Sequence, residues 1–376
     1  MSLLGTVPPE TFFSRYWQRE ALVIRNAVPH LRPLTWEALR ALACREDVES
    51  RLIKETGGAY PWEVVPGPFD PEELVGLPAS GWSLLIHEVE AHIKDAAALA
   101  NVEFLPRWHI DDVMVSSAPA GSSVGPHIDQ YDAFLVQVEG ARRWTLEPSR
   151  RDQLEDAFVD GPDLELLKTM SDTQEYVLEP GDVLYVPPGL AHHGVAIGHA
   201  QTWSIGMRAP AAHELVASFT DWALGRISPE QKYLNPNPQR QTDSARISPE
   251  EVAQMAEVVR NAIAQVDINA WLGEYLTAPA RTFDPHVAYA QSVASVPHTG
   301  TLTLRLGVRA AFVDISDEAI ELFVAGERFT IPAAGATLGR RLANTGTVEC
   351  EALETMNCTD FADVIDYLLD LGFLTT

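Results

Sequence analysis

The chain has 376 residues, of which 46% are hydrophobic and 21% are charged. This balance is typical of a globular protein, and the length allows two or three domains of roughly 100–200 residues each. Acidic residues outnumber basic ones 53 to 27, so the formal net charge is −26. Such a charge argues against a protein that binds a nucleic-acid backbone, which needs clustered Lys and Arg, and favours a basic protein partner.

Targeting and cysteine patterns narrow the cellular setting. No stretch approaches the roughly 18 apolar residues that cross a bilayer, and the first residues lack the basic and then apolar pattern of a secretory signal. The three cysteines, Cys44, Cys350 and Cys358, form no CxxC pair, which excludes a Cys-built zinc site and a disulfide framework. We therefore expect a cytoplasmic protein with no membrane segment and no direct contact with nucleic acid.

The first half of the chain reads mainly as β-structure. A helix is predicted within residues 8–27, where aromatic side chains recur at helical spacing, and it runs into a strand at 22–24. Between residues 60 and 126 the chain is rich in Gly, Pro and turn residues, with short apolar runs at 82–86 and 113–117. From 131 to 208, strands recur at roughly ten-residue spacing and are broken by Gly and Pro, a pattern typical of an all-β sandwich or barrel.

A helical region follows. Residues 211–227 predict an amphipathic helix, and after a polar segment Ser248 starts a second one. Pro249 takes the first helical position and Glu251 completes a Ser-x-x-Glu capping box, with apolar residues continuing to Leu272. Two long helices without enough partners to form a domain predict a subunit interface, and hence a homodimer.

The remaining residues mix strands with a final helix at 361–371. Gly326-Glu327 lies between two apolar runs and predicts a hairpin that resembles a wing. These patterns divide the chain into three expected parts, a β-rich domain, a helical region and an α+β domain: residues 1–210, 211–278 and 279–376.

Three side chains have the spacing of a metal site. His127 and Asp129 precede a predicted strand, and residues i and i+2 of a strand point to the same face. His192 follows the Pro-Pro-Gly turn that ends a later strand. Two imidazoles and one carboxylate leave coordination positions open, which is the facial triad of non-haem Fe(II) oxygenases.

Two nearby patterns compete with this site. A second HxD, His109-Ile110-Asp111, follows Pro-Arg-Trp rather than a Gly-rich turn, and we do not expect it to bind metal. His193 adjoins His192, but adjacent strand residues face opposite ways. We therefore expect His192 to point inward and His193 to lie behind it or face solvent.

A candidate cation for a cosubstrate lies on the next strand. Arg142 and Trp144 share strand parity, whereas Arg143 has the opposite parity. A dicarboxylate such as 2-oxoglutarate needs a cation for its far carboxylate, which Arg provides through a bidentate fork. We expect Arg142 inward and Arg143 on the surface; the alternative is a solvated pair of surface arginines.

Two stretches together resemble a known family: FLPRWHIDDVMVSSAPAGSSVGPHIDQYDAFLVQVEGARRWTLEP and PGDVLYVPPGLAHHGVAIG. They are similar to the JmjC-domain ribosomal oxygenases, and most of all to the bacterial ribosomal protein arginine hydroxylases. The resemblance implies a double-stranded β-helix of the cupin/JmjC type, a helical dimerisation region and a winged-helix-like C-terminal α+β domain. It also implies Fe(II), 2-oxoglutarate and O₂, and hydroxylation of the β-carbon of an arginine in a large-subunit ribosomal protein.

The resemblance carries the family's iron ligands and cosubstrate arginine onto His127, Asp129, His192 and Arg142. It carries the pocket for the substrate arginine onto Asp112, Met114, Tyr131 and Ser204. A carboxylate at Asp112 suits a guanidinium, whose plane Met114 and Tyr131 can sandwich. Ala191-His192-His193 stands where the family has a Pro-His-acid run, which leaves the ligands intact and changes only their surroundings.

Several alternatives stay open from the sequence. Asp112 has the chemistry to cap a turn, and Met114 and Tyr131 have the character of core residues. A histidine hydroxylase acting on another ribosomal protein is one alternative function, and a non-catalytic cupin scaffold that binds metal or a partner is another. DNA binding by the C-terminal domain conflicts with the net charge.

Overall fold

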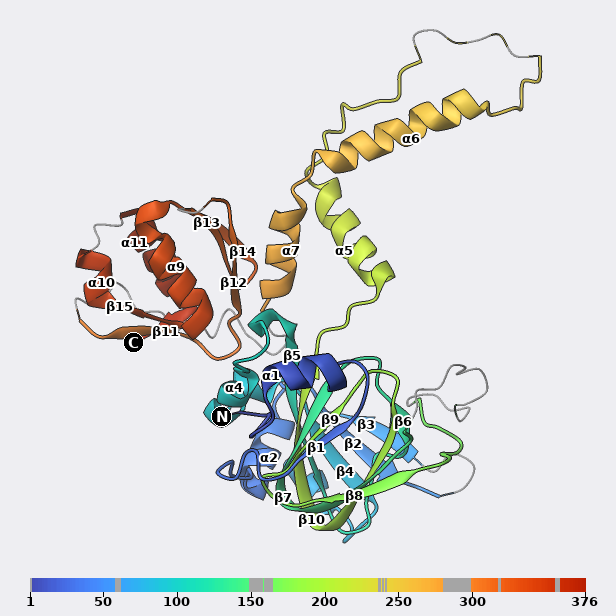
Figure 1. Cartoon of the computed structure of the whole chain (residues 1–376), viewed down its shortest axis with the longest axis vertical. Helices are drawn as coiled ribbons and strands as arrows, with labels where there is room; N and C mark the ends of the chain where they lie inside the picture. The colour runs from blue at the N-terminus through green and yellow to red at the C-terminus, as the bar shows by residue number, and fades with distance from the viewer. Residues whose placement is uncertain are drawn as a thin grey trace.

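The computed structural model describes residues 2–57, 62–148, 158, 165–235, 238, 240, 242–279, 299–316, 319–355 and 359–376. A β-rich domain, three linking helices and a C-terminal α+β domain follow one another along the chain (Figure 1). Among the described residues, none of the helices combines the length and apolar character needed to cross a membrane.

The β-rich domain is built on a ten-stranded sheet whose strands pair antiparallel. Its main path runs in the order β1 (Leu22–Ile24), β9 (Val183–Val186), β7 (Ala133–Leu146), β10 (Ala191–Met207), β5 (Ile110–Ala118), β4 (Trp82–Ile86), β2 (Ser50–Glu55) and β3 (Trp62–Pro66). Off this path, β6 (His127–Ile128) pairs with β10, and β8 (Gln174–Leu178) pairs with β7. Figure 1 shows the long strands curling toward one another, and a cavity lined by residues of β5, β7 and β10, here called the central space, lies between them.

Short helices accompany this sheet, and residues from most of them pack into its main hydrophobic core. They are α1 (Pro9–Thr11), the π-helix η1 (Phe12–Tyr16), α2 (Trp36–Ala43), α3 (Pro71–Val75), the 3₁₀ turns η2 (Val89–Ala91) and η3 (Arg107–His109), and α4 (Lys94–Ala100). Phe12 is fully buried, with its ring centroid 5.6 Å from that of Phe134 and 4.9 Å from that of Tyr185. The predicted helix and strand at the N-terminus are therefore confirmed as a core-facing element.

A kink in β7 decides which side chains face the central space. Before the kink, Phe134 and Val136 pack into the main core, while Leu135 belongs to a separate cluster with Trp144. The register of β7 with β10 shifts next to Gly140, whose φ is +59°. A Cβ at Gly140 would lie 2.0 Å from the carbonyl oxygen of His199, so only glycine fits. Beyond this bulge, the side chains that face the Leu135 side of β7 are those at even rather than odd positions. Trp144 therefore lies on the same side of the strand as Leu135.

Within the residues that the structure describes, three helices link the domains: α5 (Ala212–Leu224), α6 (Pro249–Ala264) and α7 (Ile268–Thr277). The predicted capping box is confirmed, because Ser248 Oγ accepts from the backbone N of Glu251 at 3.2 Å and Glu251 Oε2 accepts from the backbone N of Ser248 at 3.2 Å. The prediction of one helix continuing to Leu272 is wrong. Asp267 Oδ1 accepts hydrogen bonds from two backbone N–H groups, at 3.1 and 3.3 Å, and so begins a new helix there.

The C-terminal domain has two three-stranded antiparallel sheets. They are formed by β11 (Thr301–Leu304), β15 (Thr347–Glu349) and β16 (Leu374–Thr375), and by β12 (Ala310–Asp314), β13 (Ile320–Val324) and β14 (Glu327–Ile331). The accompanying helices are α9 (Ala333–Thr345), α10 (Cys350–Thr355) and α11 (Thr359–Asp370). The predicted hairpin forms, with its two-residue turn at Ala325-Gly326, one residue earlier than expected, where φ is +52° and +82°.

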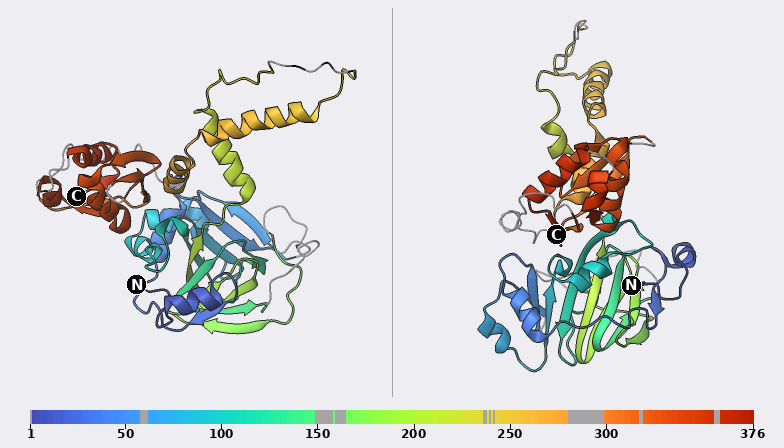
Figure 2. Two further views of the ribbon diagram at one scale, coloured as in Figure 1. Left: turned by 45° about the horizontal axis from the view of Figure 1, so that its top comes forward. Right: turned by 90° about the vertical axis from the view of Figure 1, so that its left-hand side faces the viewer.

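Arginine side chains connect the C-terminal domain to the β-rich domain beside β5. Arg107 Nη1 donates to the carbonyls of Ala343 and Asn344, at 3.4 and 3.3 Å, in the last turn of α9. Arg309 donates to the carbonyl of Asp111 at the start of β5. Figure 2 shows the C-terminal domain beside α7, with α6 pointing away from both domains.

Candidate metal centre and active-site pocket

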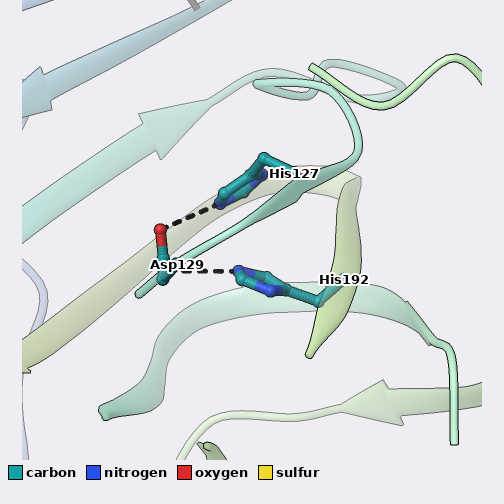
Figure 3. A group of neighbouring side chains, drawn as sticks. All are labelled: His127, Asp129 and His192. Carbon is teal, nitrogen blue, oxygen red and sulfur yellow. Dashed lines mark ion pairs between the residues drawn. The ribbon is translucent and has the colours of Figure 1, made fainter. Parts of the chain in front are cut away.

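His127, Asp129 and His192 meet at one end of the central space. His127 on β6 lies directly opposite His192 on β10, and Asp129 follows β6. One ligand atom from each of the three lies within 4.8 Å of the others. Asp129 Oδ2 is 3.5 Å from His192 Nε2, and Asp129 Oδ1 is 4.0 Å from His127 Nε2. Both imidazoles point toward the carboxylate (Figure 3).

Backbone carbonyls orient both imidazoles. His127 Nδ1 lies 2.9 Å from the carbonyl oxygen of Gly125, and His192 Nδ1 lies 3.0 Å from that of Leu190. A ring that donates from Nδ1 presents the lone pair of Nε2, which is the form that binds a metal. Burial and the nearby His127 lower the pKa of His192 to about 4, so this imidazole is neutral at pH 7.

The donor set fits a divalent transition metal. Two neutral imidazole nitrogens and one carboxylate oxygen on one side of a site leave other coordination positions open for small oxygen ligands. In the described parts of the chain, this is the one group of three His, Cys, Asp or Glu residues with ligand atoms so close together. The sequence-predicted trio therefore comes together as a candidate site for Fe(II).

The competing histidines lie elsewhere. His109 ends η3 with its ring stacked on Trp108 at 4.0 Å between centroids, and Asp111 pairs with Arg208 Nε at 3.6 Å. His193 is half-buried, and its Nε2 lies 2.7 Å from Ser123 Oγ, behind the candidate metal site. The structure thus separates these residues from the trio, as expected.

Arg142 is a buried cation beside the trio. Only 2% of the residue is exposed, and its guanidinium carbon lies 5.8 Å from the ring centroid of Trp144. Nη2 reaches Ser116 Oγ at 3.5 Å, Nε has no hydrogen-bond partner, and no described acidic side chain pairs with it. Burial lowers the pKa of Arg142 to about 10, so the side chain still carries its charge at pH 7.

An unpaired buried charge is costly, and an anionic ligand would relieve that cost. Arg142 lines the same cavity as the trio, of about 110 Å³. The far carboxylate of a dicarboxylate bound at the metal fits this cation. Arg143 is exposed, so the expected parity of the two arginines is confirmed and the alternative of a solvated pair is wrong.

The same cavity is lined by all four residues predicted to hold a substrate arginine: Asp112, Met114, Tyr131 and Ser204. Met114 on β5 pairs with Ser204 on β10. Tyr131 is 41% exposed and Met114 is half-buried, so the alternative that they are core residues is wrong. Asp112 lies within β5 rather than at a turn, and its Oδ2 is 3.1 Å from His87 Nδ1.

Sequence reasoning did not single out four other residues that line this cavity: His87, Ser116, Thr202 and Gly206. His87 directly follows the apolar run at 82–86, which forms β4, and a histidine at the end of such a run was a usable signal. Ser116 and Thr202 are buried polar residues within strands, which is itself unusual. No local sequence pattern marks Gly206, because its place in the cavity depends on its pairing with Asp112 on the neighbouring strand.

Known proteins share both this sequence and this fold. A family model described as a JmjC domain matches residues 97–215. The ribosomal protein uL16 3-hydroxylase of Escherichia coli is 32% identical over 303 residues, 79% of each chain. A probable ribosomal oxygenase of Haemophilus influenzae is 37% identical over 216 residues, which are 56% of this chain and 52% of that protein.

A solved structure extends the likeness to nearly the whole molecule. YcfD, a ribosomal oxygenase from Escherichia coli in complex with cobalt and 2-oxoglutarate, superimposes with a TM-score of 0.80 at 28% identity. The match covers 98% of both chains, including the C-terminal domain. The chain therefore has the JmjC/cupin fold and belongs to the JmjC-domain ribosomal oxygenase family.

Proposed function

We propose that this protein is an Fe(II)- and 2-oxoglutarate-dependent dioxygenase that hydroxylates the β-carbon of an arginine in a large-subunit ribosomal protein. One observation carries the proposal: a single cavity contains the trio of metal-binding side chains, the unpaired Arg142 and the carboxylate of Asp112. These are a metal site, a site for the cosubstrate anion and a site for a cationic substrate.

The cosubstrate side of the cavity is built by the trio and by Arg142. His127, Asp129 and His192 would hold Fe(II), which together with 2-oxoglutarate and O₂ supplies the oxidising power for C–H hydroxylation. Arg142 binds the far carboxylate of 2-oxoglutarate and so fixes its orientation. Trp144 lies beside this guanidinium and lines the same cavity. The cobalt and 2-oxoglutarate in the YcfD structure support this assignment.

The substrate side is built by β5 and β10. Asp112 accepts the guanidinium of the target arginine, and Tyr131 and Met114 lie on the same cavity wall to contact its plane. The net charge of −26 attracts the basic proteins of the ribosome. The name of the Escherichia coli relative supports uL16 as the substrate.

Hydroxylation of a defined peptide tests the proposal. The purified full-length chain is incubated aerobically with Fe(II), 2-oxoglutarate and a uL16 fragment, and both succinate and peptide mass are measured. We expect stoichiometric succinate and a peptide heavier by one oxygen atom, located on an arginine by fragmentation. The same incubation is repeated with the other large-subunit ribosomal proteins, and oxygen on a histidine of one of them would instead show the alternative hydroxylase. Absence of any metal-dependent turnover would favour the cupin scaffold.

We also propose that the protein is a cytoplasmic homodimer with the three units 1–210, 211–278 and 279–376. On α6, Val252, Met255, Val259 and Ile263 recur at helical spacing and are each 47–57% exposed. No residue of α6 is buried. An apolar face of this kind on a projecting helix is unfavourable in water, and the same face of a second copy covers it through a two-fold interface.

A further inference from the structure

Two cavities share four residues in front of the candidate metal centre. The inner cavity, of about 110 Å³, contains the trio, and an outer one of about 370 Å³ lies between the β-rich domain, α7 and Arg309. The residues that line both cavities are His87, Asp112, Tyr131 and Gly206. We call these four residues the portal, because a side chain that reaches the metal from the outer cavity passes between them.

His87 holds the carboxylate of Asp112 in place. It directly follows β4, and its backbone N donates to the carbonyl of Glu49 at 2.9 Å, which fixes the backbone. Its Nδ1 lies 3.1 Å from Asp112 Oδ2. An aspartate carboxylate rotates over a broad range about its terminal torsion. A hydrogen bond from His87 to Oδ2 fixes the Asp112 carboxylate in one orientation. In the described structure Oδ1 accepts no hydrogen bond, so it is left for a ligand.

Gly206 leaves the space in front of that free oxygen open. It pairs with Asp112 across β10 and β5. A Cβ at Gly206 would lie 3.1 Å from Asp112 Oδ1 and 3.7 Å from Tyr131 Cε2. Its φ is outside the left-handed region, so an alanine fits the backbone without strain. The missing side chain therefore creates a narrow slot between a carboxylate oxygen and an aromatic ring.

We infer that His87 and Gly206 determine substrate specificity by shaping this slot for a planar guanidinium. The inference rests on the proposed function and names two further residues for it. His87 is a positioning residue that presents Asp112 Oδ1 toward the slot. Gly206 sets the slot width, so that a flat cation stacks on Tyr131 while donating to the carboxylate.

Three variants test the role of the portal: His87→Ala, His87→Asn and Gly206→Ala. With the uL16 fragment, His87→Ala and Gly206→Ala should each raise the KM for the peptide about tenfold, the effect of losing one charge-assisted hydrogen bond, with little change in kcat. The KM for 2-oxoglutarate, which binds at Arg142, should stay within about twofold. His87→Asn should restore the peptide KM, because its amide N–H donates to Asp112 as Nδ1 does.

His213→Ala and Gly225→Ala are matched controls. Both residues lie in or just after α5, with His213 exposed and the nearest atom to a Cβ at Gly225 being a backbone oxygen at 3.7 Å. A peptide whose target arginine carries one Nη-methyl group gives a second measurement on the unaltered protein. The methyl group keeps the charge but occupies the slot, so its KM should also rise about tenfold.

The results separate this inference from the proposed function. If the unaltered protein hydroxylates the fragment but His87→Ala and Gly206→Ala keep its peptide KM, the portal assignment is wrong. Failure of His87→Asn to restore KM would overturn the positioning role. An unchanged KM for the methylated peptide would contradict the slot, even if Gly206→Ala did not fold. No hydroxylation by the unaltered protein would reject the proposed function itself.

Discussion

His127 and His192 are paired directly across β6 and β10, with ring centroids 4.2 Å apart. Each ring is held by a backbone carbonyl two residues earlier. The metal site is therefore organised by strand pairing and by main-chain acceptors, and only the Nε2 atoms and the Asp129 carboxylate are left to bind an ion.

Removing one member of the trio should remove the metal. We expect His127→Ala or Asp129→Ala to abolish succinate formation and to weaken Co²⁺ binding by at least about a hundredfold, since three ligands act together. Isothermal titration of Co²⁺ into the protein measures this. His109→Ala is the matched control, because the second HxD lies away from the trio, and it should bind Co²⁺ like the unaltered protein. Equal Co²⁺ affinity in all three variants would contradict the site.

Arg142→Ala should mainly raise the requirement for 2-oxoglutarate. Loss of a charge-assisted pair in a buried cavity costs about 2–3 kcal/mol, or roughly a hundredfold in affinity. The KM for 2-oxoglutarate reports this, with Arg143→Ala as the exposed control on the same strand. A normal KM in Arg142→Ala would show that another group binds the far carboxylate.

Glu90 should make stability depend on pH. Burial raises the pKa of Glu90 to about 8, the nearby Asp112 adds to this, and the bond from the backbone N of Val113 opposes it. The unfolded value is about 4.3, so the folded state binds an extra proton between these values. This contribution to stability is present in full below about pH 4 and is lost as pH rises toward 8.

Glu90→Gln keeps the acceptor for Val113 and removes the charge. We expect the free energy of unfolding of the variant, relative to the unaltered protein, to rise between pH 5 and pH 8 in urea titrations. Glu103→Gln, at an exposed position, serves as control and should show no such trend. Parallel pH curves for Glu90→Gln and the unaltered protein would disprove the raised pKa.

A charge on α6 should separate the proposed dimer. Val259→Asp places a carboxylate within the exposed apolar face of α6, where pairing would bury it without a partner. We expect a molar mass near that of one chain by light scattering, compared with twice that mass for the unaltered protein. Glu257→Gln, beside this face, should leave the mass unchanged. A monomeric unaltered protein would contradict the proposed interface.

Local patterns predicted the trio and the orientation of Arg142. The i, i+2 spacing places His127 and Asp129 on one face. The Pro-Pro-Gly turn precedes His192, and alternation along a strand separates Arg142 from Arg143.

Strand alternation alone would place Leu135 and Arg142 on opposite faces of β7, because an odd number of residues separates them. Both line the cavity because the bulge at Gly140 shifts the alternation between them. The partnership of His87 with Asp112 depends on the pairing of β4 with β5. A long-range contact of this kind leaves no mark in local sequence.

The helix break at Asp267 shows a different limit. Apolar periodicity continues across residues 265–267, but the aspartate side chain competes for backbone N–H groups and starts α7 there. The spacing of apolar residues shows which face of a helix is apolar, but it does not show where one helix ends and the next begins.

The most direct measurement is the intact mass of every large-subunit ribosomal protein from cells with and without this gene, followed by peptide mapping. We predict that one protein loses the mass of one oxygen atom in the deletion strain, and that the difference maps to the β-carbon of a single arginine. Identical masses for all ribosomal proteins in the two strains would contradict the proposed hydroxylase activity.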